Sequence, residues 1–271
     1  MNREYNETKV QAYTPSKEEI RKYWDDKQPG QWYSKERIDE KAYYDEVEFK
    51  RYNLFCPYIP KIAEFKEHKG EKVLEIGMGM GMDLKQYAEN GAICHGVDLT
   101  EGAIKKARHF FELHGLKAEL YVMDAENLQF EDDTFDLVYS LGVLHHTPNT
   151  QKAIDEIYRV LKPNGKAIVM LYSKSWQHYI IRVLYAGIIG RELFRMSRQE
   201  LINKYSEAYG FSPLTKLYNR REVRSFFTKF KEVDVSHWHY KVPDKNGPMQ
   251  KLKSLKNWRY LQGNWVIKAI K

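Results

Sequence analysis

Cysteine is scarce in this chain of 271 residues, which contains only Cys56 and Cys94. Two well-separated cysteines can build neither a disulfide-stabilised secreted scaffold nor a cysteine-based metal site. The N-terminal segment MNREYNETKV is polar and charged, unlike a secretory signal. These absences predict a cytoplasmic protein without a bound metal.

A long uninterrupted apolar run is also missing. The longest apolar stretch, WQHYIIRVLYAGIIGRELF at 176–194, carries His178, Arg182 and Arg191. A membrane-spanning helix needs roughly 18–20 predominantly apolar residues. We therefore predict a covering helix and no transmembrane segment, while peripheral contact with a membrane surface stays open.

Charge is distributed unevenly along the chain. The formal net charge is +7, yet residues 71–170 hold ten Lys and Arg against sixteen Asp and Glu. A basic periphery around an acidic middle suits an anionic partner such as RNA, a phosphorylated metabolite or a membrane surface. It equally suits a solvated surface that keeps the protein in solution.

An alternation of short apolar strands and amphipathic helices begins at residue 71 and predicts an α/β domain. Such alternation is typical of a doubly wound parallel sheet covered by helices on both faces. Two further strands, KEVDVSHWH and NWVIKAIK, have no long helix between them and are expected to pair antiparallel. The predicted parallel strands are EKVLEIG, AICHGVDL, AELYVMDA, TFDLVYSLGVL and KAIVMLY.

Two helical regions flank or interrupt this alternation. Residues 1–70 are charged and rich in Tyr and Trp; we expect a helix capped by Thr14 or Ser16 and a second helix that ends at Gly70. Residues 173–218 look helical and supply no strand. We therefore predict an N-terminal region (1–70), a core domain (71–172 and 219–271) and a helical insertion (173–218).

The segment KVLEIGMGMGMDL at 72–84 places three glycines two residues apart, directly after the first predicted strand. Glycine weakens regular structure by roughly 0.5–1 kcal/mol relative to alanine, so this spacing indicates a tight turn or a close approach. Gly77 and Gly79 suit the approach of a ligand, and Gly81 suits close helix packing. Ligands of doubly wound sheets bind beyond the carboxyl ends of the strands.

Acidic residues end the next two predicted strands. Asp98 lies twenty-one residues after Gly77, where an acid can accept hydrogen bonds from ribose hydroxyls. Asp124 can accept from the exocyclic amine of adenine, with the Ala125 amide beside it for a ring nitrogen. The convergence of these residues at one sheet edge predicts a nucleoside site.

The type of nucleoside follows from the surrounding residues. Dinucleotide folds use G-x-G-x-x-G, whereas here the third glycine follows the second by two positions. Glu75 and Asp83 place acids around the loop, which disfavours a pyrophosphate. The fourth predicted strand ends at Ser140 and Leu141, whose carbonyls can accept from an ammonium group. A cofactor with a cationic tail fits better than a dinucleotide.

Four consecutive motifs resemble the class I S-adenosylmethionine-dependent methyltransferases, especially the small-molecule branch that includes the ubiquinone/menaquinone-biosynthesis type. They cover about residues 70–172 in the family's order and spacing. The resemblance implies a seven-stranded Rossmann-like sheet, mostly parallel with an antiparallel last strand. Met78 departs from the family's usual cysteine or small residue at a position where only the backbone is needed. The motifs are VLEIGMGMGMD, GVDLTEGAI, DAENLQFEDDTFDLVYSLGVLHH and EIYRVLKPNGKAIVM.

The resemblance implies that the cofactor is S-adenosyl-L-methionine and the product S-adenosyl-L-homocysteine. The methyl group would be transferred by in-line displacement, in which positioning contributes on the order of 7–11 kcal/mol. The implied binding residues are Glu75, Gly77, Gly79 and Gly81 for the methionine part, Asp98 with the adjoining Leu99 for the ribose, Asp124 and Ala125 for adenine, and Ser140 and Leu141 for the amino group.

His145 and His146 are the candidate general bases because they follow the fourth strand, beside the expected methyl group. An imidazole that titrates near neutral pH suits this task, which is needed only if the nucleophile carries a proton. The alternative is that these rings pack or bind the cofactor's carboxylate.

The methyl acceptor is expected to contact residues outside the shared core. The N-terminal region, with Trp32, can fold over the cofactor as a lid, and residues 173–218 can act as a substrate cap. Ordinary helical packing and a dimer contact are the alternatives. Candidate acceptor contacts are Tyr33, Tyr43, Tyr44, Tyr172 and Trp176.

The sequence thus predicts a methyltransferase that acts on O, N, S or C of a small molecule, as a monomer or homodimer. An RNA methyltransferase is the alternative enzyme, favoured by the basic stretch KVPDKNGPMQKLKSLKNWR with its neighbouring aromatic residues. No separate RNA-binding domain is visible in the sequence, which makes nucleic acid the less favoured partner. A non-catalytic S-adenosylmethionine-binding protein is the third possibility.

Overall fold

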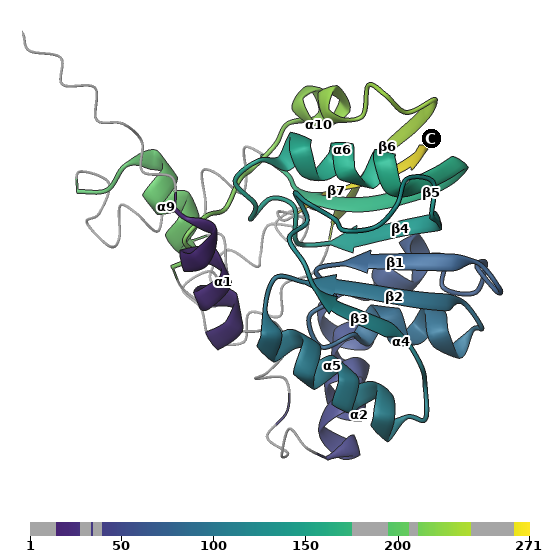
Figure 1. Cartoon of the computed structure of the whole chain (residues 1–271). Coiled ribbons are helices and arrows are strands. Elements are labelled where there is room, and N and C mark those ends of the chain that lie inside the picture. The colour runs from purple at the N-terminus through teal and green to yellow at the C-terminus, as the bar shows by residue number, and fades with distance from the viewer. Residues whose placement is uncertain (1–14, 28–33, 35–39, 175–194, 206–210, 240–262) are drawn as a thin grey trace, which may run out of the picture.

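A seven-stranded sheet organises the part of the chain that the computed structural model describes, namely residues 15–27, 34, 40–174, 195–205, 211–239 and 263–271 (Figure 1). The strand order is β3-β2-β1-β4-β5-β7-β6. The strands are β1 (Lys72–Ile76), β2 (Ile93–Asp98), β3 (Glu119–Val122), β4 (Phe135–Leu141), β5 (Leu161–Tyr172), β6 (Glu232–His239) and β7 (Gly263–Ile270).

The strand directions confirm the predicted doubly wound sheet with an antiparallel last strand. β1 to β5 pair in parallel, whereas β7 pairs antiparallel with both β5 and β6. The order along the chain reverses between β1 and β4. In such sheets this switch point opens a crevice at the carboxyl ends of the strands, which is where ligands bind.

Helices cover both faces of the sheet, as buried apolar strands require. One core packs α2 (Lys41–Lys50), α3 (Ile59–Ile62), α4 (Met82–Glu89) and α5 (Glu101–Leu113) against the strands. The other core packs α6 (Thr150–Val160) and α10 (Arg220–Phe226) on the opposite face (Figure 1). The remaining described helices are α1 (Lys17–Asp26), the π-helical turn η2 (Arg51–Phe55) and α9 (Arg198–Tyr205).

Several helix starts lie at capping residues recognisable in the sequence. Ser16 caps α1 and forms a capping box with Glu19, and Asn219 does the same for α10 with Glu222. Thr100 accepts a hydrogen bond from the Ala103 amide and caps α5. These local signals fix the helix ends because each satisfies amides that have no partner within the helix.

The predicted helix that ends at Gly70 is wrong. α3 ends at Ile62, and Glu64 follows in the left-handed region with φ 57°. A non-glycine residue seldom adopts this conformation, and it takes the chain out of the helix. The fifth strand is longer than predicted, because β5 already begins at Leu161 and reaches its main register with β4 after a register shift between Leu161 and Lys166.

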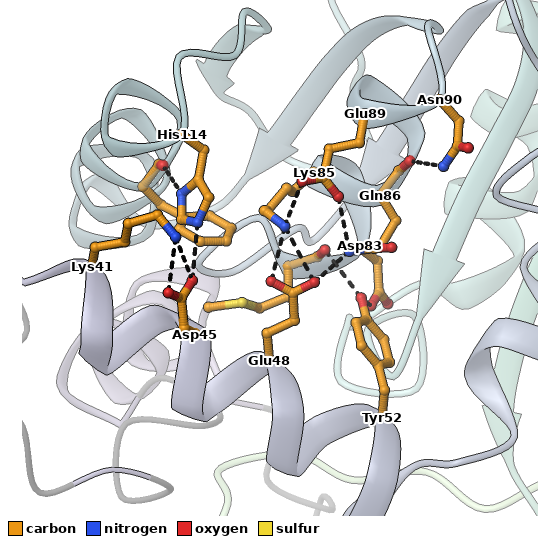
Figure 2. A network of polar contacts seen from close by, with 12 residues as sticks. Lys41, Asp45, Glu48, Tyr52, Asp83, Lys85, Gln86, Glu89, Asn90 and His114 are labelled. Carbon is orange, nitrogen blue, oxygen red and sulfur yellow. Dashed lines mark hydrogen bonds and ion pairs between the residues drawn. The ribbon is translucent and has the colours of Figure 1, made fainter.

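Polar side chains dock α2 and η2 onto the core domain (Figure 2). Lys85 of α4 lies between Glu48 at 3.0 Å and Glu89 at 2.8 Å, and Asp45 lies 3.2 Å from His114 at the end of α5. Because Lys85 is buried, its ammonium group needs these acidic partners. The N-terminal region is thereby fixed beside the crevice.

Glu64 joins the chain before the sheet to two strands inside it. Its carboxylate lies 2.7 Å from Lys166 of β5 and 2.5 Å from Lys268 of β7, and His68 lies 3.7 Å away. His68 and the two lysines hold the pKa of Glu64 well below its ordinary value of 4.5. A lowered pKa means that Glu64 stabilises the folded state above about pH 4.5 and loses this effect as the pH falls.

Substitution of Glu64 by Gln tests this contact. We expect the free energy of unfolding at pH 7 to fall by about 2 kcal/mol, because two ammonium groups lose a charged acceptor. The difference from the parent should shrink at pH 4, where the parent also loses part of the stabilisation. Urea unfolding at both pH values measures this, with the exposed Glu67→Gln as control; an equal loss at both pH values would contradict the prediction.

Candidate functional site

A cavity of about 270 Å³ opens at the carboxyl ends of the central strands. Its floor is the glycine-rich loop between β1 and α4. Its sides come from the ends of β2 and β4, the segment after β3, and the N-terminal elements α1, α2 and η2. Predicted cofactor residues that line it are Glu75, Gly77, Gly79, Asp98, Leu99, Asp124, Ala125 and Leu141.

The glycine loop adopts backbone conformations that favour glycine. Gly77, Gly79 and Gly81 have φ of +71°, +56° and +82°. A Cβ at Gly77 would lie 2.2 Å from Val143, and one at Gly81 would lie 3.1 Å from Phe111 of α5, whereas a Cβ at Gly79 would meet no atom within 4 Å. Gly81 therefore allows helix packing, and Gly79 leaves open space at the cavity.

Asp98 is held in place by the main chain around the cavity. One carboxylate oxygen accepts from the Gly79 amide at 3.0 Å, and the other accepts from the amide and hydroxyl of Thr100 at 2.9 Å each. Burial raises the pKa of Asp98, and these donors oppose that effect. A carboxylate has about four acceptor positions, so capacity remains for one further donor.

Asp124 also faces the cavity, but its carboxylate is engaged by the N-terminal helix. Oδ1 accepts from the Glu126 amide at 2.9 Å, and Oδ2 pairs with the ammonium group of Lys17. Lys17 was not among the predicted site residues. Its contact joins positions 107 residues apart, so no local sequence pattern marks it.

The pKa values of the two acids beside the glycine loop shift in opposite directions. Burial and the nearby Asp83 raise the pKa of Glu75 well above its ordinary value. Burial also acts to raise the pKa of Asp83, but Arg51 and the hydroxyls of Tyr52 and Tyr139 outweigh it and lower that pKa. Of the two acids predicted to rim the loop, Asp83 is therefore paired with a cation, and burial disfavours the charged form of Glu75.

Arg51 is a further site residue that the sequence did not reveal. Its guanidinium group lines the cavity and makes two hydrogen bonds to Asp83, at 2.9 and 2.6 Å. It lies on η2, and single π-helical turns are frequent at functional sites. This turn is visible only in the structure, because residue types do not reveal it. The sequence therefore offered no signal for Arg51.

The two candidate histidines have different surroundings. His146 lines the cavity, and its Nδ1 lies 2.7 Å from the carbonyl oxygen of Leu214. A carbonyl only accepts, so Nδ1 carries a hydrogen and Nε2 of the neutral ring carries the lone pair. His145 is fully buried behind Tyr172, with ring centroids 3.7 Å apart, and is not among the described residues that line the cavity. Burial and then His146 lower its pKa well below 6.5, which leaves it neutral.

Tyr43 and Tyr44, predicted to contact the acceptor, are placed elsewhere. Both are fully buried, and neither is among the described cavity-lining residues. Tyr44 stacks on Phe110 of α5 at 4.8 Å, and the Tyr43 hydroxyl lies 3.8 Å from the Met80 sulfur. Their rings fill the space between α2 and the core domain, because large aromatic side chains gain most by full burial.

The other predicted residues divide into three groups. Tyr172 lines the cavity at the end of β5. Ser140 is buried, and its hydroxyl donates to the Ile76 carbonyl at 3.1 Å, so it joins two strands beneath the site. Trp32, Tyr33, Trp176 and the whole basic stretch 241–259 lie outside the described residues.

Helix α1 forms one wall of the cavity through Lys17, Ile20 and Trp24. The Trp24 ring packs edge-on against His146, with centroids 4.8 Å apart. At the other end of the helix, Asp25 accepts from the Gly102 amide at 2.9 Å. The N-terminal region therefore reaches the cavity through α1, together with Val47 and Arg51, and not through its buried tyrosines.

Two properties concern the described segments as a whole. Every helix in them is too short or too polar to cross a membrane. Groups of three or more His, Cys, Asp or Glu side chains arranged to hold a metal ion are absent from them.

Comparison with known proteins identifies the domain that carries this site. Residues 74–169 match the model of the methyltransferase domain family. Phosphoethanolamine N-methyltransferase 2 of Caenorhabditis elegans is 34% identical over 44% of this chain and 27% of its own length. Ubiquinone biosynthesis O-methyltransferase of Coxiella burnetii is 30% identical over 45% of this chain and 52% of its own length.

Residues 74–169 are a class I S-adenosylmethionine-dependent methyltransferase domain. The chain spans about a quarter to a half of the length of the two curated relatives. A solved structure of phosphoethanolamine N-methyltransferase 2 from Haemonchus contortus superimposes with a TM-score of 0.58 at 21% identity, over 93% of this chain and 60% of that one. At this identity the likeness establishes the fold of the methyltransferase domain and not its substrate.

Substitution of Gly77 by Ala tests the packing of the loop. We expect a loss of about 1–2 kcal/mol from the left-handed backbone and a further loss of about 1–3 kcal/mol from the collision with Val143. Gly115→Ala is the matched control, because Gly115 has φ +63° but no atom within 4 Å of the added methyl group. Equal losses of unfolding free energy in urea for the two variants would contradict this account.

Proposed function

We propose that this protein binds S-adenosylmethionine in the cavity and transfers its methyl group to a small-molecule acceptor. The observation that carries the proposal is the convergence of Asp98 and Asp124 on one cavity across the glycine loop. The family match and the relatives' names support methyl transfer. The Haemonchus relative was solved with S-adenosylhomocysteine, which supports the choice of cofactor.

The residues present fit this cofactor. Asp98 retains acceptor capacity for a ribose hydroxyl, and the open space at Gly79 leaves room for a ligand against the main chain. Asp124 supplies a carboxylate for the adenine amine, and the Ala125 amide is beside it. Arg51 lines the same cavity and is suited to a carboxylate group. Leu99 and Leu141 add apolar contacts.

The bound cofactor supplies a methyl group that its sulfonium already activates. The protein therefore has to position the donor and the acceptor and to exclude water. The glycine loop and the acids orient the donor. Helix α1 covers one side of the cavity, and the aromatic rings of Trp24, Tyr172 and His146 give it an apolar surface. Where the acceptor carries a proton, Nε2 of His146 is the atom that takes it.

The acceptor is expected to bind on the side formed by α1, η2 and Tyr172, outside the family domain at 74–169. We retain the assignment of residues 173–218 as a substrate cap within this proposal. By their names, the two relatives are a phosphoethanolamine N-methyltransferase and an O-methyltransferase of ubiquinone biosynthesis. Nitrogen and oxygen acceptors are therefore the first classes to test.

Cofactor binding is tested by calorimetry with S-adenosylhomocysteine and, separately, with NAD⁺. We expect the parent to bind the first and not the second. Asp98→Asn should weaken S-adenosylhomocysteine binding by about 10- to 100-fold, because a charge-assisted hydrogen bond contributes roughly 1.5–3 kcal/mol. The control is Glu112→Gln, a substitution of an acid on α5 that does not line the cavity. Failure of the parent to bind S-adenosylhomocysteine would refute the proposed function.

The general base is tested after labelled S-adenosylmethionine and a cell extract have identified an acceptor. We expect His146→Ala to lower turnover by about 100-fold or more, in the range that general base catalysis contributes. Binding of S-adenosylhomocysteine should stay within about threefold of the parent, which controls for folding. Turnover within a factor of about two of the parent would eliminate His146 as the base.

A further inference from the structure

Lys17 connects helix α1 to two acids of the methyltransferase domain through the charge of its side chain. Its ammonium group pairs with Asp124 and lies 2.9 Å from Glu126. Glu126 is almost fully buried, with 5% of its side chain exposed, whereas Lys17 is 41% exposed. The side chain of Lys17 thus lines the cavity and reaches from its partly exposed edge to a buried acid.

The two oxygens of Asp124 have different tasks. Oδ1 accepts from the Glu126 amide at 2.9 Å, which holds the turn after β3. Oδ2 is the oxygen that pairs with Lys17. If the adenine amine donates to Asp124, as the proposed function requires, it joins a carboxylate that already has one donor on each oxygen. The amide bond to Oδ1 belongs to the turn itself, so the ammonium group on Oδ2 is the donor that can leave without changing the main chain.

Glu126 gives the lysine a second partner that the cofactor does not need. Its Oε2 faces Lys17, while Oε1 accepts from the Thr147 hydroxyl and from the Asn149 amide at 2.6 Å. These two donors lie in the segment that directly follows His146. Glu126 therefore ties the position of Lys17, and with it α1, to the loop that carries the candidate base.

We propose that Lys17 is a positioning residue that gives up Asp124 and keeps Glu126 when adenosine enters the cavity. This inference rests on the proposed function. After Lys17 has left Asp124, its contact with Glu126 still anchors the first turn of α1. Asp25 anchors the last turn of α1 on the Gly102 amide. Trp24 then stays against His146 while the donor is bound. The lysine lowers the affinity for the cofactor and in return keeps the cavity covered.

Lys17→Met separates these two effects, because methionine keeps an unbranched apolar stem and removes the charge. We expect S-adenosylhomocysteine to bind about 3- to 10-fold more tightly to this variant by calorimetry, since its competitor is gone. Hydrogen–deuterium exchange of residues 17–26 in the S-adenosylhomocysteine complex should be at least about fivefold faster than in the parent complex. Lys17→Arg can still contact both acids and should exchange at a rate close to the parent.

The matched control is Lys22→Met, which removes a charge from the same helix at a position that does not line the cavity. It should leave both measurements within about twofold of the parent. Equal or weaker binding by Lys17→Met would overturn the competition, and unchanged exchange would overturn the anchoring on Glu126. If the parent itself binds no S-adenosylhomocysteine, the proposed function fails and this inference fails with it. A binding parent combined with an unresponsive Lys17→Met refutes the inference alone.

Discussion

The ion pair between the partly buried Arg51 and the fully buried Asp83 is the interaction on which the site's architecture depends. Removing two charges from water is costly and is offset only when geometry and further hydrogen bonds are favourable. Here Asp83 accepts from the guanidinium group twice and from the hydroxyls of Tyr52 and Tyr139. These donors come from η2 and β4, so one carboxylate at the start of α4 joins the N-terminal region, the glycine loop and the central strand.

The sheet and much of the cavity floor could be predicted because their signals are local. The apolar strands, the glycine spacing and the acids at Asp98 and Asp124 each lie within a few residues of the element they define. Parallel topology then brings the strand ends together without any knowledge of side-chain contacts. The capping residues Ser16, Thr100 and Asn219 could be predicted for the same reason, since each acts on its own first turn.

The cavity wall formed by α1, η2 and Tyr172 could not be predicted, because it depends on contacts between distant residues. Tyr43, Tyr44 and Tyr172 are the same residue type, yet packing between α2 and the core domain buries the first two while the third lines the cavity. The adjacent residues His145 and His146 differ only in the direction that the turn after β4 gives them. Lys17 and Arg51 are ordinary charged helix residues until the fold supplies Asp124 and Asp83 as partners.

The boundary of the family domain has a consequence for the choice of methyl acceptor. The family domain begins at residue 74 and ends at residue 169, whereas Lys17, Trp24, Arg51 and Tyr172 all lie outside it. Identity with the curated relatives likewise covers less than half of this chain. On the proposed function, the family domain binds the donor, and the acceptor meets mainly residues from the N-terminal helices. The shared domain then places few constraints on the acceptor, and changes in α1, in η2 or at Tyr172 are expected to alter the substrate while the donor side stays intact.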